Sequence, residues 1–174
     1  TSVNKQELCI NGMSFSKRQS KYANSALVVT VNPDDMKSLA GDSPLRGIYW
    51  QQHFERKAAT MGGNNLLVPV QKVTDFLESK LNLEDYVRIS SSYRLGVVPA
   101  PLHMMYPSFV TNVLKEALYK FDQQMPGFIS SDALLHGVET RTSAPIQIAR
   151  DPETLQSVSM KGLYPCGEGA GYAG

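Results

Sequence analysis

The chain has 174 residues, a length that suits one domain or one domain with part of another. Hydrophobic residues make up 42% of it, which excludes a disordered tail and is typical of a chain that buries a core. Seventeen Lys and Arg against sixteen Asp and Glu give a formal net charge of +1, so no charge excess favours nucleic acid or an anionic membrane as a partner. No apolar run approaches the ~20 residues of a membrane span.

Cysteine and histidine are sparse and scattered. The two cysteines, Cys9 and Cys166, form no C-x-x-C pair, which argues against a disulfide framework or a structural zinc site and suits a reducing, cytoplasmic compartment. A single disulfide between them stays open. His53, His103 and His136 have no metal-ligand spacing, so we expect no metal and interpret each as a surface or half-buried side chain.

Two short strands are predicted near the start. Residues 8–10 run into Asn11-Gly12, a dipeptide that tolerates the positive φ angles of a tight turn. Residues 26–31 are apolar and β-branched and stop at Asn32-Pro33, which indicates a buried strand followed by a turn. The basic stretch 17–21 between them is interpreted as a solvated loop.

Helices are predicted in the middle of the chain. Ser43-Pro44 reads as a helix start and Gly62-Gly63 as its end. The helical period places one group of side chains inward, namely Leu45, Ile48, Phe54, Ala58 and Met61, and leaves another in water, namely Gln51, Gln52, Glu55 and Arg56. A second helix is expected over 70–80, and the clearest one runs from Pro107 to Pro126-Gly127.

The remaining segments complete an α+β class. Residues 82–101 are expected to form a long loop with at most one short strand. After Ser130 the pattern alternates, which predicts short strands at 138–142, 146–149, 156–160 and 163–166, with a turn at 150–154 between the second and third. The order of short strands at both ends and helices in the middle favours α+β.

A glycine cluster closes the sequence. Gly167 to Gly174 reads GEGAGYAG, and its last six residues match G-x-G-x-x-G. This match is weak because no helix or acidic residue follows, and a merely flexible tail is an equal alternative. Glu168 favours a binding role, since a carboxylate beside glycines can accept hydrogen bonds from the hydroxyls of a sugar or polyol.

Two longer motifs carry a resemblance to a known family. Residues 137–145, GVETRTSAP, and 161–174, KGLYPCGEGAGYAG, look like the C-terminal part of the uncharacterised FAD-dependent dehydrogenases, flavoproteins with a split FAD-binding domain. Short pieces upstream match in the same order, among them 11–14, 23–26 and 92–97. The resemblance implies that the tail is the second FAD contact, with Gly167, Glu168, Gly169, Ala170, Gly171 and Tyr172 beside the ribityl chain or a neighbouring phosphate.

The same resemblance implies a domain division and a partner. Residues 1–31 would be a strand segment, 32–129 an inserted helical cap or substrate region, and 130–174 the returning strands with the FAD contact. The nucleotide-binding βαβ unit would lie in a missing remainder of the parent chain, so this chain alone is expected to be inactive and to hold FAD only weakly. Exposed strand edges near Leu8 and Ala26 would favour a homo-oligomer.

Other functional readings stay open. Glu139 and Arg141 lie two apart on a predicted strand and face the same side, so with Thr142 they could lie near flavin or substrate, or simply form a solvated ion pair. Cys166 is read as a packed residue rather than a redox thiol, and Ser143 lacks the G-x-S-x-G elbow of a hydrolase. The leading prediction is a fragment of an oxidoreductase of unknown substrate. The alternative is a non-catalytic module in which residues 43–124 bind a ligand or protein.

Overall fold

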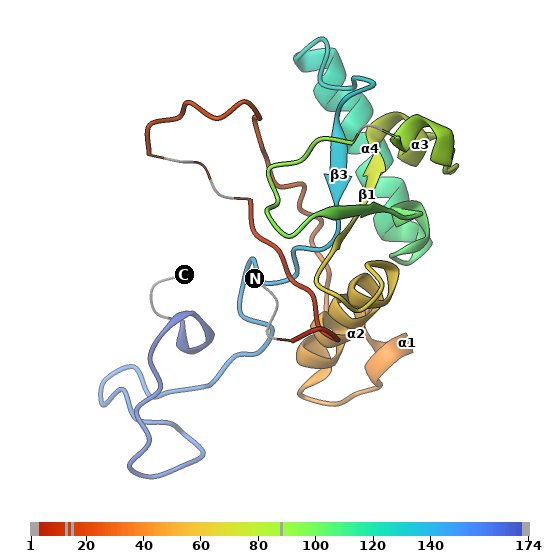
Figure 1. Ribbon diagram of the computed structural model, residues 1–174. Helices are drawn as coiled ribbons and strands as arrows, with labels where there is room; N and C mark the ends of the chain where they lie inside the picture. Colours follow the sequence, from red (N-terminus) through yellow and green to blue (C-terminus); the bar gives the residue numbers. More distant parts are fainter. Residues whose placement is uncertain (1–3, 13, 15, 88, 172–174) are drawn as a thin grey trace. The chain divides into compact units, whose positions relative to one another are not determined.

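The computed structural model describes residues 4–12, 14, 16–87 and 89–171 (Figure 1). The chain divides into two compact units, of which the first contains residues 1–30 and 53–139 and the second contains 31–52 and 140–174. Helices and strands are both present, and the α+β class predicted from the sequence is confirmed. In the part of the chain that the structure describes, no helix has the length and apolar character to cross a membrane.

A small mixed sheet organises the first unit. Its central strand is β1 (Val68–Lys72), which pairs in parallel with β2 (Val97–Pro99) and antiparallel with β3 (Leu134–His136), giving the order β2-β1-β3. Val68 and Val70 are fully buried. Pro69 of this central strand has no amide N–H to donate, but its carbonyl oxygen accepts the Gly137 amide at 2.9 Å.

This strand corrects the helix predicted over 70–80. The helical period of Val73, Phe76 and Leu77 is real, but only Val73–Leu77 forms a helix, the short α3. Residues 68–72 pair with strands that lie far away in the sequence, which local periodicity does not report. The single short strand expected within 82–101 is confirmed as β2, and a 3₁₀ turn, η1 (Leu83–Tyr86), precedes it.

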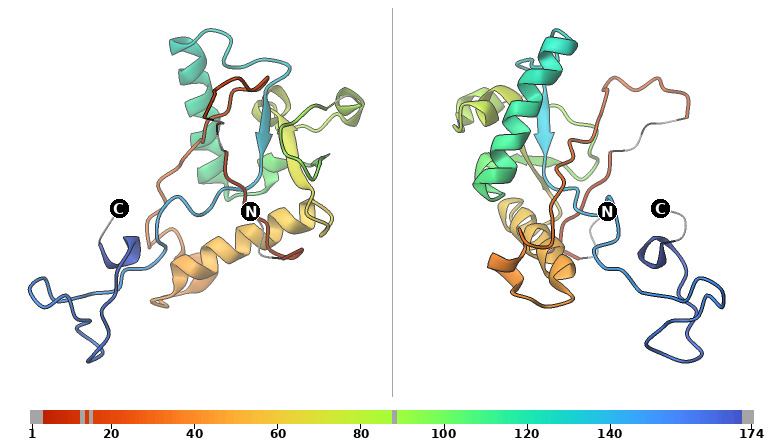
Figure 2. Two further views of the ribbon diagram at one scale, coloured as in Figure 1. Left: turned by 60° about the vertical axis from the view of Figure 1, so that its left-hand side comes forward. Right: turned by 180° about the vertical axis from the view of Figure 1, so that it is seen from behind.

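The long helix α4 (Ser108–Gln124) confirms the helix predicted from Pro107, which is its N-cap residue. Figures 1 and 2 show α4 running alongside β3 and covering one face of the sheet. Val110 and Leu118 are buried there, whereas Val113 points outward. A 3₁₀ turn, η2 (Leu102–Met104), leads into the helix and buries Leu102.

The helix α2 (Arg46–Met61) begins two residues after the predicted start and ends where predicted. Ser43 Oγ accepts a hydrogen bond from the Leu45 amide at 3.2 Å, so the serine stabilises the turn before the helix. Glu55 was expected on the wet side but is buried, because the N-terminal segment lies against it and the Leu8 amide donates to the Glu55 carbonyl oxygen at 3.1 Å. Conversely, Leu45 is exposed.

Several predicted strands are wrong. Residues 26–31 are irregular and Val28 is 65% exposed. Residues 8–10 form no strand, although the Ile10 amide donates to the Val138 carbonyl oxygen at 2.8 Å. None of the four strands expected after Ser130 forms, apart from an isolated bridge between Arg150 and Ser157. The sequence also missed a short helix, α1 (Lys37–Ala40).

Buried polar groups of the first unit form hydrogen bonds around the end of β1. The Tyr86 hydroxyl donates to Asp75 at 3.0 Å and accepts the Lys72 amide at 2.7 Å. Gln71 is fully buried; its Nε2 donates to the Lys80 carbonyl oxygen at 2.6 Å, and its Oε1 accepts the His103 amide at 3.0 Å. These bonds join β1 to the ends of α3 and η2 and satisfy the buried polar atoms.

Candidate functional site

The glycine-rich end belongs to the second unit and makes a tight turn. Residues Glu168–Ala170 form one 3₁₀ turn, η3, flanked by Gly167 with φ +96° and Gly171 with φ +75°. Both φ values lie in the left-handed region, which favours glycine. A Cβ added at either position would meet no atom of the described chain, so the space beside both glycines is open to an approaching group.

A second segment of the same unit lies against this turn. The Ile148 amide donates to the Gly169 carbonyl oxygen at 2.7 Å. A Cβ at Gly169 would stand 3.4 Å from the Ile146 carbonyl oxygen and 3.7 Å from the Ala144 methyl, which are ordinary contact distances and show that the two segments are close neighbours. Together the two segments enclose an open hollow of about 360 Å³, lined by Ser143, Ala144, Pro145, Ile146, Gln147, Glu168, Gly169 and Gly171.

The lining of the hollow has a distinct chemistry. It offers one carboxylate, from Glu168, together with the Ser143 hydroxyl and the Gln147 amide, and none of its side chains is basic. A carboxylate accepts hydrogen bonds from hydroxyl groups and repels an anion. The hollow therefore suits a neutral ligand that carries several hydroxyl groups better than it suits a phosphate.

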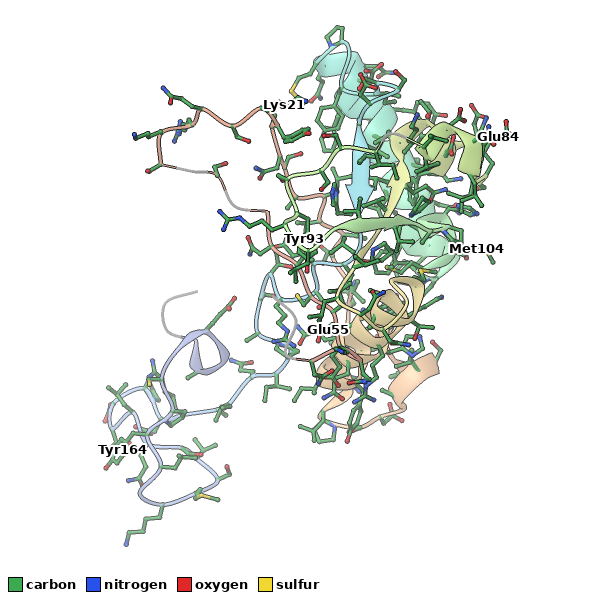
Figure 3. The ribbon with its side chains drawn as sticks, in the orientation of Figure 1. Lys21, Glu55, Glu84, Tyr93, Met104 and Tyr164 are labelled. Atoms are coloured by element: carbon green, nitrogen blue, oxygen red, sulfur yellow. The ribbon has the colours of Figure 1, made fainter. Side chains whose placement is uncertain are left out.

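The segment 148–164 that precedes the glycine turn has little core of its own. Its large apolar side chains are exposed, including Ile148, Leu155, Val158, Met160, Leu163 and Tyr164. Figure 3 shows Tyr164 standing away from the ribbon, in agreement with its 61% exposure. Surfaces of this kind mark places where other protein normally packs.

The predicted turn at 150–154 does form. Asp151 organises it, since one carboxylate oxygen accepts the Thr154 amide at 2.7 Å, the Glu153 amide at 3.0 Å and the Thr154 hydroxyl at 3.0 Å. These hydrogen bonds, with those from Thr154 first, hold the pKa of Asp151 below its usual value.

The other residues predicted near a flavin are not among those that line the hollow. Glu139 accepts a hydrogen bond from Asn11 Nδ2 at 3.2 Å within the first unit. Arg141 and Thr142 are exposed and belong to the second unit. Residues 138–142 form no strand, so the prediction that Glu139 and Arg141 face one side of a sheet is wrong. Tyr172 falls outside the described residues.

Two of the three histidines, His53 and His103, contact neighbouring side chains of the first unit. Nδ1 of His103 lies 2.8 Å from Gln71 Nε2, and burial lowers the pKa of His103. Burial and the nearby Lys57 lower the pKa of His53, which stacks edge-on against Phe54. Among the described residues, no group of three His, Cys, Asp or Glu side chains could hold a metal ion, and no disulfide joins Cys9 to Cys166.

Sequence reasoning missed three residues of the hollow's lining. Ile146 and Gln147 were predicted only as parts of a strand. Ser143 was considered only as a hydrolase nucleophile. Ser143 to Pro145 stood in the motif that carried the family resemblance, so that motif held the available signal. The distance between this motif and the glycine turn depends on how residues 148–166 fold, which the sequence pattern does not predict.

Comparison with known proteins identifies the family. The sequence model of a family described as "FAD-dependent protein, C-terminal domain-like" matches residues 1–142. An uncharacterised protein of Clostridium beijerinckii is 44% identical over 167 residues, which cover 96% of this chain and 30% of that protein. The chain belongs to this family of FAD-dependent proteins and spans less than a third of that relative's length. The predicted resemblance to FAD-dependent proteins is confirmed.

Proposed function

We propose that this chain is the C-terminal part of an FAD-dependent oxidoreductase and that its hollow contacts the ribityl chain of the flavin. The observation that carries the proposal is the Glu168 carboxylate between two left-handed glycines, at the edge of an open hollow with hydroxyl-binding groups. The family supplies the link to FAD. The hollow residues lie beyond residue 142, so their assignment rests on this geometry and on the motif rather than on the family match.

The charge of the lining favours the ribityl chain over a phosphate. The motif resemblance allows either group beside Glu168. A phosphate would bring negative charge toward a carboxylate with no basic side chain in the lining to offset it. The ribityl hydroxyls instead can donate to Glu168, and Ser143 and Gln147 can complete their hydrogen bonds.

In the intact protein the flavin would supply hydride or electron transfer when bound. The residues of this chain would hold and orient its polyol arm, with Glu168 accepting hydroxyl protons in hydrogen bonds and the two left-handed glycines allowing close approach of the backbone. The substrate and the electron acceptor are not defined by these groups.

The rest of the parent polypeptide is the proposed partner of this chain. Two observations support it: the chain spans 30% of its relative, and the segment 148–164 exposes large apolar side chains. We infer that this segment packs against the remainder of the parent protein, which would also carry the nucleotide-binding half of the FAD site.

The first test is a titration of the 174-residue chain with FAD. We expect no submicromolar binding by flavin fluorescence, because the hollow is open and most of a dinucleotide's contacts would come from the missing part. Tight binding by this chain alone would contradict the proposal that the FAD site is shared with the rest of the parent protein.

The second test uses the full-length parent protein with Glu168→Gln. The amide keeps the size of the side chain but weakens a charge-assisted hydrogen bond, so we expect FAD affinity to fall about tenfold or more. Glu153→Gln is the matched control, since Glu153 is exposed in the 150–154 turn of the same unit and does not line the hollow. Equal FAD affinity in both variants would remove Glu168 from the site.

A further inference from the structure

A serine and a histidine of the first unit form a close pair that the proposed FAD contact does not use. His136 is the last residue of β3 and stands opposite Val70 of the central strand, so its backbone is held by the sheet. Ser91 lies in the loop that leads to β2 and is 45 positions away in the sequence. The distance from Ser91 Oγ to His136 Nε2 is 2.8 Å.

The hydrogen bonds around the imidazole define its tautomer. Nδ1 of His136 lies 3.2 Å from the Leu134 carbonyl oxygen, which can only accept, so Nδ1 carries the proton. Nε2 is then the unprotonated nitrogen and accepts the Ser91 hydroxyl proton. A base that receives a hydroxyl proton while a third group orients it is the arrangement of an activated nucleophile.

The serine oxygen is also oriented. The Tyr93 amide donates to Ser91 Oγ at 3.1 Å and occupies one of its two lone pairs. With the proton directed at His136, the second lone pair is left for an electrophile. Ser91 is half-buried and His136 is exposed, so a small molecule can reach the pair; Figure 3 marks the neighbouring Tyr93.

We propose that Ser91 is a nucleophilic serine activated by His136, with acyl esters as its substrate class. Ser91 Oγ would bond to the acyl carbon while its proton passes to His136 Nε2. The carbon–oxygen bond to the leaving alcohol then breaks, and that alcohol takes the proton from His136, which leaves an acyl-serine for water to hydrolyse.

The state of the imidazole supports the assignment. Desolvation of the ring lowers the pKa of His136, against the raising effect of its hydrogen bond to Leu134. A lowered pKa favours the neutral imidazole, which is the form able to accept a proton. The sequence held no sign of the pair, because a loop and a strand far apart in the chain bring it together and no G-x-S-x-G motif surrounds Ser91.

The test is labelling of the folded chain with an alkyl fluorophosphonate, followed by mass spectrometry of its peptides. Attack by Ser91 forms the phosphorus–oxygen bond and expels fluoride, while the proton passes through His136 to the buffer. We expect the adduct on Ser91 and not on Ser90 or Ser92. Unfolding in guanidinium should slow labelling of Ser91 by about a hundredfold, the usual scale of general-base assistance.

Two variants separate activation from exposure. His136→Asn keeps an amide that can reach the Leu134 carbonyl oxygen but removes the base, so the labelling rate should fall about a hundredfold. Ser92→Ala, a change at an exposed neighbour, should leave the rate unchanged. The proposal is overturned if Ser91 in the wild-type chain labels no faster than Ser90 and Ser92, if unfolding does not slow it, or if folded His136→Asn labels at the wild-type rate.

Discussion

At the scale of single residues, the buried cluster around Tyr86 shows how a few hydrogen bonds hold the first unit. The Tyr86 hydroxyl connects the Asp75 carboxylate to the Lys72 amide, and both Tyr86 and Asp75 are almost fully buried. Burial is the main reason that the pKa of Tyr86 rises to about 12, and the hydrogen bond to Asp75 adds to it. The neutral phenol is therefore the form that the fold requires.

We predict that Tyr86→Phe lowers the free energy of unfolding by about 1–3 kcal/mol, because it leaves a buried carboxylate and a backbone amide short of a partner. Urea unfolding at pH 7 measures this difference. Tyr119→Phe, at an exposed position of α4, is the control and should change stability by less than about 0.5 kcal/mol. A Tyr86 variant as stable as the control would show that the cluster contributes nothing.

The same residue predicts an alkaline limit of stability. A folded-state pKa of about 12 lies above the ~10 of an unfolded tyrosine. The folded state thus binds the proton more tightly, so its stabilisation is complete below pH 10 and is lost as pH rises from 10 to 12. The wild-type chain should lose stability in this window more steeply than Tyr86→Phe, as urea midpoints across pH 9 to 12 would report.

At the scale of elements, α2 illustrates a contact that helix periodicity does not reveal. Gly47 lies in its first turn, and a Cβ there would stand 2.1 Å from the Pro145 carbonyl oxygen of the same unit. A glycine is required at position 47 because the backbone of residues 140–147 passes too close for a side chain, and not because a turn needs a positive φ angle. Gln51 Nε2 donates to the Thr140 carbonyl oxygen at 2.8 Å and ties the same two segments together.

We predict that Gly47→Ala destabilises the chain by about 1–3 kcal/mol, since the methyl group must displace backbone atoms. Intrinsic helix propensity alone predicts the opposite sign, a gain of up to about 1 kcal/mol. Asn112→Ala, on the exposed face of α4, is the matched control that changes propensity without a clash. Urea unfolding of both variants decides between steric and propensity effects, and a stabilised Gly47→Ala would contradict the contact.

At the scale of the whole molecule, the second unit exposes apolar side chains of the kind that other protein normally covers. Six large apolar side chains between residues 148 and 164 are exposed. This stretch contains no helix, and the strands predicted there are replaced by one isolated bridge between Arg150 and Ser157. The sequence predicted that chains associate through an exposed strand edge at residues 26–31. Those residues form no strand, so this edge is absent. The apolar segment is now the surface expected to drive association.

We predict that the isolated chain self-associates, with a light-scattering mass that exceeds 19.2 kDa and increases with concentration. Replacing Val158 and Met160, which are 68% and 61% exposed, by serine should shift the mass toward the monomer without altering the circular dichroism. A wild-type chain that stays monomeric at every concentration would argue that the segment needs no cover.

Local signals in the sequence determined the features that depend only on neighbours along the chain. The apolar period and the flanking proline and glycines predicted α2 and α4 to within a few residues, and the order of elements predicted the α+β class. The resemblance to FAD-dependent proteins, drawn from the two long motifs and the shorter pieces upstream, agrees with the family match over residues 1–142. Helices can be predicted from the sequence because each helical residue forms its backbone hydrogen bond with another residue only four positions away.

The tertiary structure alone decided where distant segments meet. Residues 68–72 became a strand because β2 and β3 satisfy both of their edges, and Glu55 is buried because the N-terminal segment lies over it. The hollow exists because 143–147 fold back against Glu168 and its glycines, and Ser91 reaches His136 across 45 positions. Local periodicity does not predict these long-range contacts, because each one involves a segment far away in the sequence.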